Sequence, residues 1–158
     1  MGIGQALHGL PLAAWIRGSP WAYPAVETVH IIALALLFGS IAVVDLRLLG
    51  VSRALPVTLL LRHALPVSML AFTVAAATGS LLFLTHADDL VGNRVFVVKM
   101  GLIMLAGINA AEFHTGAHAD IRSWDSGCAA PLAARLGAGV SLSLWISVIA
   151  CGRWIAYA

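Results

Sequence analysis

Two residues that can handle protons or metals, Glu27 and His30, lie in a segment that is otherwise almost wholly apolar, "VETVHIIALALLFGSIAVV". They are three residues apart, which places them on one face of a helix, one turn from each other. A carboxylate in that position can take a proton from the imidazole, fix its tautomer and raise its basicity. This spacing indicates a metal ligand or a proton-handling site, and a purely structural hydrogen bond is the alternative.

Three further histidines, His63, His114 and His118, lie at the ends of apolar segments. If the segments that carry His63 and His114 are consecutive antiparallel helices, the two rings lie at the same depth, because the midpoint between them falls in the loop at Asp88. Two imidazoles at one depth favour a haem held between two helices. His118 is one turn beyond His114 and is a substitute ligand or a propionate contact. The alternative is that these histidines only flank helix ends.

Basic and sulfur-containing side chains occur near the same two depths. Two arginines lie at the level of the inner histidines, and a lysine and an arginine lie nearer the other surface, where they can neutralise propionates. A methionine near the depth of His30 can complete a His/Met haem site or a soft-metal site. These residues are Arg62, Arg135, Lys99, Arg153 and Met104.

The elements that position these residues follow from composition. Of the 158 residues, 61% are hydrophobic and 10% are charged, whereas a soluble domain has about 25% charged residues. Four apolar segments are long enough to cross a bilayer, which takes about 20 residues. The sequence therefore predicts one all-α domain, a four-helix transmembrane bundle with a short interfacial N-terminal helix. The predicted spans are residues 21–50, 59–85, 95–117 and 131–157.

Depth along the first span places His30 near the middle of the bilayer. It follows the interfacial Trp21 by nine residues, which is ~13 Å at the helical rise. Ionisable residues at that depth face the bundle interior or a cavity, where they find partners. At the inner end of the same span, Asp45 and Arg47 are two residues apart and cannot contact each other on a helix. We expect partners on other helices, with Asn109 and Glu112 as candidates.

Several classes of function are excluded by the sequence. It has no Walker loop, GxGxxG, GxSxG or HExxH motif, and we expect no nucleic-acid partner, although the net charge of +2 does not bear on this. Cys128 and Cys151 lie at opposite ends of the fourth predicted span, so they are expected not to pair.

The distribution of basic residues predicts the orientation. Arginines gather in the loops at one end of the predicted bundle, which the positive-inside rule places in the cytoplasm of a bacterial cell, with both termini outside the inner membrane. These arginines are Arg47, Arg53, Arg62, Arg122 and Arg135. Cysteine labelling tests this prediction: a cysteine at Ser52 should react only from the cytoplasmic side, and reaction from the outside would reverse the topology.

Longer motifs resemble known families. The segments "VETVHIIALALLFGSIAVVDLRLLG", "TGSLLF", "NRVFVVKMGLIMLAGINAAEFH" and "CGRWIAYA" resemble a family of small bacterial four-helix membrane proteins of unknown function, over about residues 20–157. More distantly, "VHIIALALLFGS" with "VKMGLIML" is similar to HemJ-type protoporphyrinogen oxidases and to the CopD copper-resistance membrane domain. The HemJ resemblance implies haem b, with His30 and Lys99 matching a histidine of the first helix and a lysine of the third. The Trp and Tyr-Leu-Pro-Arg context of those enzymes is absent, which favours the haem over the oxidase activity.

Together these features predict a haem b protein, with one or two haems, that passes electrons alone or as the membrane subunit of a redox complex. The iron ligands would come from His30, His63 and His114. The alternatives are a HemJ-like oxidase, a CopD-like copper protein and a cofactor-free structural subunit. In the copper alternative, the histidines would act with Met69, Met100 and Met104. Expected partners are the lipid bilayer and other redox subunits or further copies of the chain.

Overall fold

The computed structural model describes residues 3–116 and 121–157, and these ranges contain helices and no strand. Four long helices form the bundle, α3 (Ala22–Leu49), α4 (Val57–Thr85), α6 (Arg94–Thr115) and α7 (Leu132–Trp154). The shorter elements are α1 (Ile3–His8), α2 (Pro11–Gly18), α5 (Ala87–Leu90) and the 3₁₀ turns η1 (Ile121–Ser123) and η2 (Ile155–Tyr157).

The four long helices are each apolar and long enough to span a membrane, which confirms the predicted architecture. Their ends follow from local chemistry. α6 begins after Asn93, whose side-chain oxygen accepts from the backbone N–H groups of Val95 at 2.9 Å and Phe96 at 3.2 Å. α3 ends at Gly50, which has a left-handed φ of 110°, a conformation that glycine adopts without steric cost.

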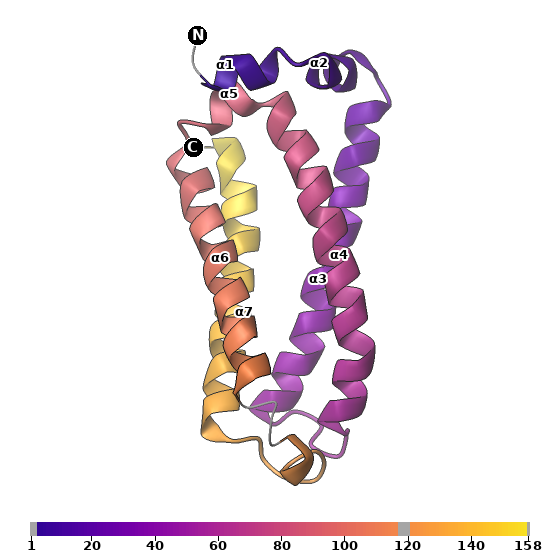
Figure 1. Ribbon diagram of the computed structural model, residues 1–158, viewed down its shortest axis with the longest axis vertical. Coiled ribbons are helices and arrows are strands. Elements are labelled where there is room, and N and C mark those ends of the chain that lie inside the picture. Colours follow the sequence, from indigo (N-terminus) through magenta and orange to yellow (C-terminus); the bar gives the residue numbers. More distant parts are fainter. Residues whose placement is uncertain (1–2, 117–120, 158) are drawn as a thin grey trace.

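The long helices pack in the order α4–α3–α7–α6 (Figure 1). α3 packs against both α4 and α7, and α6 packs mainly against α7. α4 and α6 have no comparable interface in the described part of the chain, although both border the interior. The bundle is therefore tightly packed on three sides and looser between α4 and α6.

Two short helices cross the end of the bundle that also holds the end of α7, which we call the terminal end (Figure 1). Where one short interfacial helix was expected, the structure has α1 and α2, because Pro11 starts a second helix. The Arg17 guanidinium holds this segment in place by donating to the carbonyls of His8 at 2.9 Å and Thr85 at 3.4 Å. Trp15 and Trp21 are largely exposed there, as expected for interfacial anchors.

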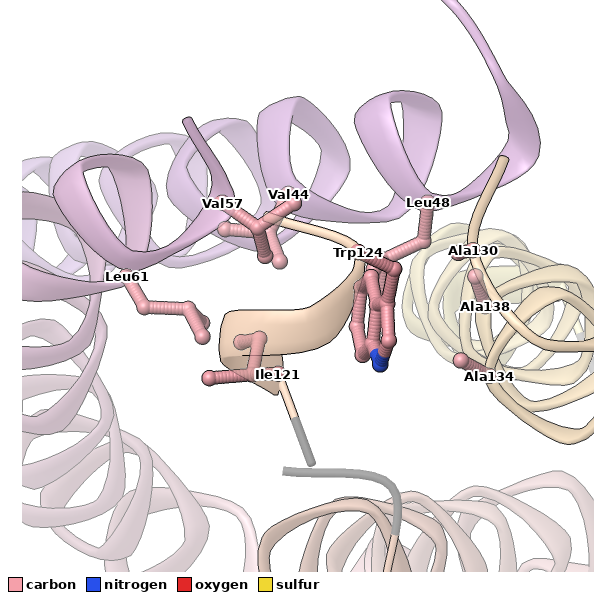
Figure 2. Close-up of a cluster of buried hydrophobic side chains, with 9 residues drawn as sticks. All are labelled: Val44, Leu48, Val57, Leu61, Ile121, Trp124, Ala130, Ala134 and Ala138. Atoms are coloured by element: carbon pink, nitrogen blue, oxygen red, sulfur yellow. The ribbon is translucent and has the colours of Figure 1, made fainter. Parts of the chain in front are cut away.

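The opposite end, which we call the loop end, is closed by a cluster of buried apolar side chains (Figure 2). The Trp124 indole and Ile121 come from the loop that precedes α7 and lie between the ends of the long helices. They meet Leu48 of α3, Leu61 of α4 and small alanines of α7. Because alanine leaves room, the loop can enter the bundle and seal this end.

Arg47 joins α3 to two loops at the loop end. Its side chain is 2% exposed, and Nε donates to the Leu55 carbonyl at 2.7 Å. Its Nη2 donates to the carbonyls of Arg53 and Asp125, both at 3.0 Å. The expectation that Asn109 or Glu112 would pair with Arg47 or Asp45 was wrong for the arginine, because loop carbonyls accept from its Nε and Nη2, while its buried Nη1 has no hydrogen-bond partner among the described residues.

Asp125, in the loop that precedes α7, caps the N-terminus of α4 beside Arg47. Its carboxylate accepts from the Thr58 N–H at 2.7 Å and from the Thr58 hydroxyl at 2.9 Å. The Thr58 N–H holds the pKa of the Asp125 carboxyl below its ordinary value, and the Arg47 guanidinium acts in the same direction. An anion at a helix N-terminus also interacts favourably with the helix dipole.

Replacing Arg47 should weaken the contacts between the end of α3 and the loops that precede α4 and α7. Arg47→Ala removes a buried guanidinium and leaves three partly buried loop carbonyls without this donor, so we expect the free energy of unfolding to fall by roughly 3 kcal/mol. Arg47→Lys should recover only part of this loss, because one ammonium cannot span the positions of a forked guanidinium. Thermal unfolding of the purified protein in detergent measures the effect, with exposed Arg122→Ala as the matched control. Equal unfolding midpoints for Arg47→Ala and Arg122→Ala would contradict this role.

Candidate functional site

His30 lies on α3 and contacts α4 through one ring nitrogen. Its Nδ1 is 2.9 Å from the Thr78 hydroxyl, and this hydroxyl donates its own hydrogen to the Val74 carbonyl at 2.7 Å. A hydroxyl has one hydrogen to donate, so Thr78 accepts from His30. The hydrogen-bond network therefore assigns the proton to Nδ1 and leaves the lone pair on Nε2.

The backbone of α4 is shaped to receive the His30 ring. A Cβ atom on Gly79 would lie 3.0 Å from Cε1 of His30, which is closer than side chains normally pack. Glycine at this position therefore lets the imidazole lie directly against the neighbouring helix. The sequence segment "TGSLLF" thus supplies both the hydrogen-bond partner and the space for the ring.

Lys99 enters the same level of the bundle from α6. Its Nζ lies 3.5 Å from the position that a Cβ of Gly152 would occupy, so the amine rests against the backbone of α7. The Lys99 ammonium is also within electrostatic range of the His30 ring. We call His30, Thr78, Gly79, Lys99 and Gly152 the His30 site. All four long helices contribute to it.

Glu27 does not hold the His30 ring in the structure. It is exposed one turn nearer the terminal end, and its influence on His30 is electrostatic only. The role expected of Glu27 belongs to Thr78, which is 48 residues away in the sequence. Helical spacing identified a carboxylate on the same face, but α3 turns His30 toward α4, where a hydroxyl is closer.

The structure does not bring His63 and His114 together. His63 is exposed, and its Nδ1 lies 2.9 Å from the carbonyl of Leu59 in its own helix. His114 lines a cavity inside the bundle, which His63 does not border. The two residues have matching depths, but their helices present them in different directions. His118 lies outside the described residues.

The other residues expected at a cofactor also face away from the His30 site. Met104 is 69% exposed on α6 and is not part of the cavity lining. Arg62 and Arg135 are exposed near the loop end. The Arg153 guanidinium donates to the Tyr157 hydroxyl at 2.6 Å and lies over that ring. Of the expected basic residues, Lys99 is therefore the one that the structure places beside His30.

A cavity of about 500 Å³ lies between the four long helices, in the half of the bundle nearer the loop end. Most of its walls are apolar, and Gly107 and Ala111 of α6 keep one side open. Its polar lining includes Asp45 of α3 and Asn109 and His114 of α6. The sequence predicted a partner for Asp45 on another helix but not that Asp45 lines a cavity.

The cysteines do not form a disulfide, and no cluster of metal ligands occurs in the described part of the chain. Cys128 and Cys151 are both free, as expected. Within the described residues, no three side chains among histidine, cysteine, aspartate and glutamate lie close enough to hold a metal ion.

Sequence comparison establishes the family. The chain belongs to the family of unknown function DUF6644, whose pattern matches residues 21–158. This confirms the resemblance to a family without an assigned function. Comparison with curated proteins and with solved structures gives no match. The likeness to HemJ-type and CopD proteins therefore still depends on the residues quoted above.

The tautomer of His30 can be tested directly. In the wild-type protein, ¹⁵N chemical shifts of labelled histidine should show His30 with its proton on Nδ1, with the signals assigned by their loss in His30→Gln. Thr78→Val keeps the side-chain shape and removes the acceptor, so the tautomer should become mixed. Thr73→Val, one turn away on the exposed face of α4, should leave it unchanged. A wild-type ring protonated on Nε2 would contradict the assignment.

Proposed function

We propose that this chain is a haem b-binding membrane protein that passes electrons, either alone or as the membrane subunit of a redox complex. The observation that carries the proposal is the orientation of His30. Histidines that ligate metals almost always donate their other ring N–H to a protein acceptor, which fixes the tautomer and aims the lone pair. Thr78 gives His30 this arrangement inside an apolar bundle.

The side-chain types at the His30 site suit a haem, because they include an imidazole, a hydroxyl and an ammonium group. His30 would be the axial ligand through Nε2, and Thr78 would orient it. The Lys99 ammonium would neutralise a propionate carboxylate, which needs a cation when it is taken into a membrane. The haem, when bound, supplies a one-electron Fe(III)/Fe(II) couple. The surrounding apolar spans exclude water, so hydrogen bonding to the His30 ring is controlled by the protein.

Oxidation of a porphyrinogen is a second candidate, favoured by one specific observation. HemJ-type enzymes carry a histidine on the first helix and a lysine on the third, and here His30 and Lys99 are within electrostatic range across the bundle. Copper binding has weaker support, because Met69, Met100 and Met104 are exposed on the sides of two helices.

We also propose that the loop end faces the cytoplasm of a bacterial cell.

Substitution of His30 tests the haem proposal. His30→Ala should lose the haem, measured as the ratio of Soret to protein absorbance after expression with haem supplied. His63→Ala is the matched control, because that ring is exposed and contacts only its own helix. It should retain the wild-type haem content. Full haem content in His30→Ala, with loss in His63→Ala, would move the ligand to the other histidine and reject this site.

A further inference from the structure

Asp45 is a buried carboxylate that the protein does not fully satisfy. It is 6% exposed, and its Oδ2 atom has no hydrogen-bond partner among the described residues. The Ser141 hydroxyl of α7 hydrogen-bonds to the carboxylate, but one donor is too few for a group that has about four acceptor positions. An unsatisfied buried acceptor costs about 1–3 kcal/mol, and more if it is charged. Such a group is expected to have a partner that the chain itself does not supply.

This carboxylate lines the cavity described above, which is large enough for a small molecule. Its volume of about 500 Å³ lies within the range of ~300–1,000 Å³ that is usual for ligand pockets. The walls carry the aromatic rings of Phe72, Phe113 and Trp145 among aliphatic side chains. Apolar walls with a few polar groups are typical of a site for a largely hydrophobic ligand.

The cavity opens sideways rather than toward water. Its wall on α4 includes Leu65, Met69 and Phe72, which are 40–64% exposed and border the loosely packed side between α4 and α6. At the loop end, the buried cluster around Trp124 lies between the ends of α3, α4 and α7 (Figure 2). A ligand would therefore enter from the lipid, where uncharged molecules concentrate.

The lining of the cavity contains both donors and acceptors of hydrogen bonds. The Asn109 amide donates through Nδ2 to the Gly137 carbonyl at 3.2 Å, and the Ser40 and Ser68 hydroxyls donate to carbonyls of their own helices, at 3.0 Å and 2.9 Å. The Trp145 indole N–H is a donor, and the His114 ring can donate and accept. Among the polar atoms of the lining, Asp45 Oδ2 is the one that is buried without a partner in the described part of the chain, and a donor from a ligand would meet its need best.

We propose that this cavity binds a lipid-soluble molecule with an uncharged hydroxyl on an aromatic ring, of the phenol or hydroquinone class. The ring would lie among the aromatic walls, and its O–H would donate to Oδ2 of Asp45. An alkylammonium ion could also meet the carboxylate, but it would have to leave water as a charge before entering from the lipid. The site is separate from the haem proposal, because Asp45 lies 15 residues along α3 from His30, about 22 Å at the helical rise.

Photolabelling tests the proposal without any haem measurement. The full chain in phosphatidylcholine nanodiscs is irradiated with an alkylphenol that carries a diazirine on its chain, and labelled peptides are located by mass spectrometry. The label should fall on the cavity-lining parts of α4 and α6. Unlabelled para-nonylphenol should compete at about a tenfold lower concentration than its methyl ether, para-nonylanisole, as expected for a hydrogen bond to a charged acceptor.

Substitutions test whether Asp45 causes the preference for the phenol over its methyl ether. Asp45→Asn leaves only an uncharged acceptor and should narrow the difference between the phenol and the ether, whereas Asp89→Asn, on the exposed short helix α5, should keep it. Equal competition by the two compounds in the wild-type protein would overturn the proposal, even if Asp45→Asn does not fold. Stronger competition by nonylamine than by the phenol would overturn the choice of an uncharged ligand. Labelling confined to residues outside the cavity would also reject the site.

Discussion

The hydrogen bonds of Arg47 to three backbone carbonyls set the geometry of the loop end, on which the interior of the bundle depends. A guanidinium is one of the few side chains that can satisfy carbonyls from two loops at once, because its donors are held in a rigid fork. By fixing the end of α3 against the loops before α4 and α7, Arg47 also fixes the rotation of α3. That rotation decides which of its residues face inward.

α3 is the central helix, because it packs against both α4 and α7. His30 and Asp45 lie at different levels of α3 and have different surroundings. His30 meets a hydroxyl and a glycine on α4, in a site to which Lys99 of α6 and the backbone of α7 at Gly152 also contribute. Asp45 lies in the wider half, where α4 and α6 separate and a cavity remains. One helix thus contributes to two polar sites at different levels of the bundle.

The fold could be predicted from the sequence because apolar length alone identifies a membrane span. The pairing of side chains between helices could not be predicted from the sequence. α3 is apolar on nearly all sides, so periodicity does not reveal which face meets a neighbour. Glu27 was therefore chosen as the partner of His30 from spacing within one helix, whereas Thr78 of α4 holds the ring. Matching depth likewise suggested a His63–His114 pair, although depth says nothing about the direction of a side chain.

The central claim is that an imidazole held by Thr78 serves as the axial ligand of a haem inside the bundle. The most direct measurement is the visible absorption spectrum of the full chain, purified after expression with haem supplied, in its oxidised and reduced forms. The account predicts a Soret band in near-stoichiometric amount that shifts on reduction. A colourless protein that is fully folded under these conditions would contradict it.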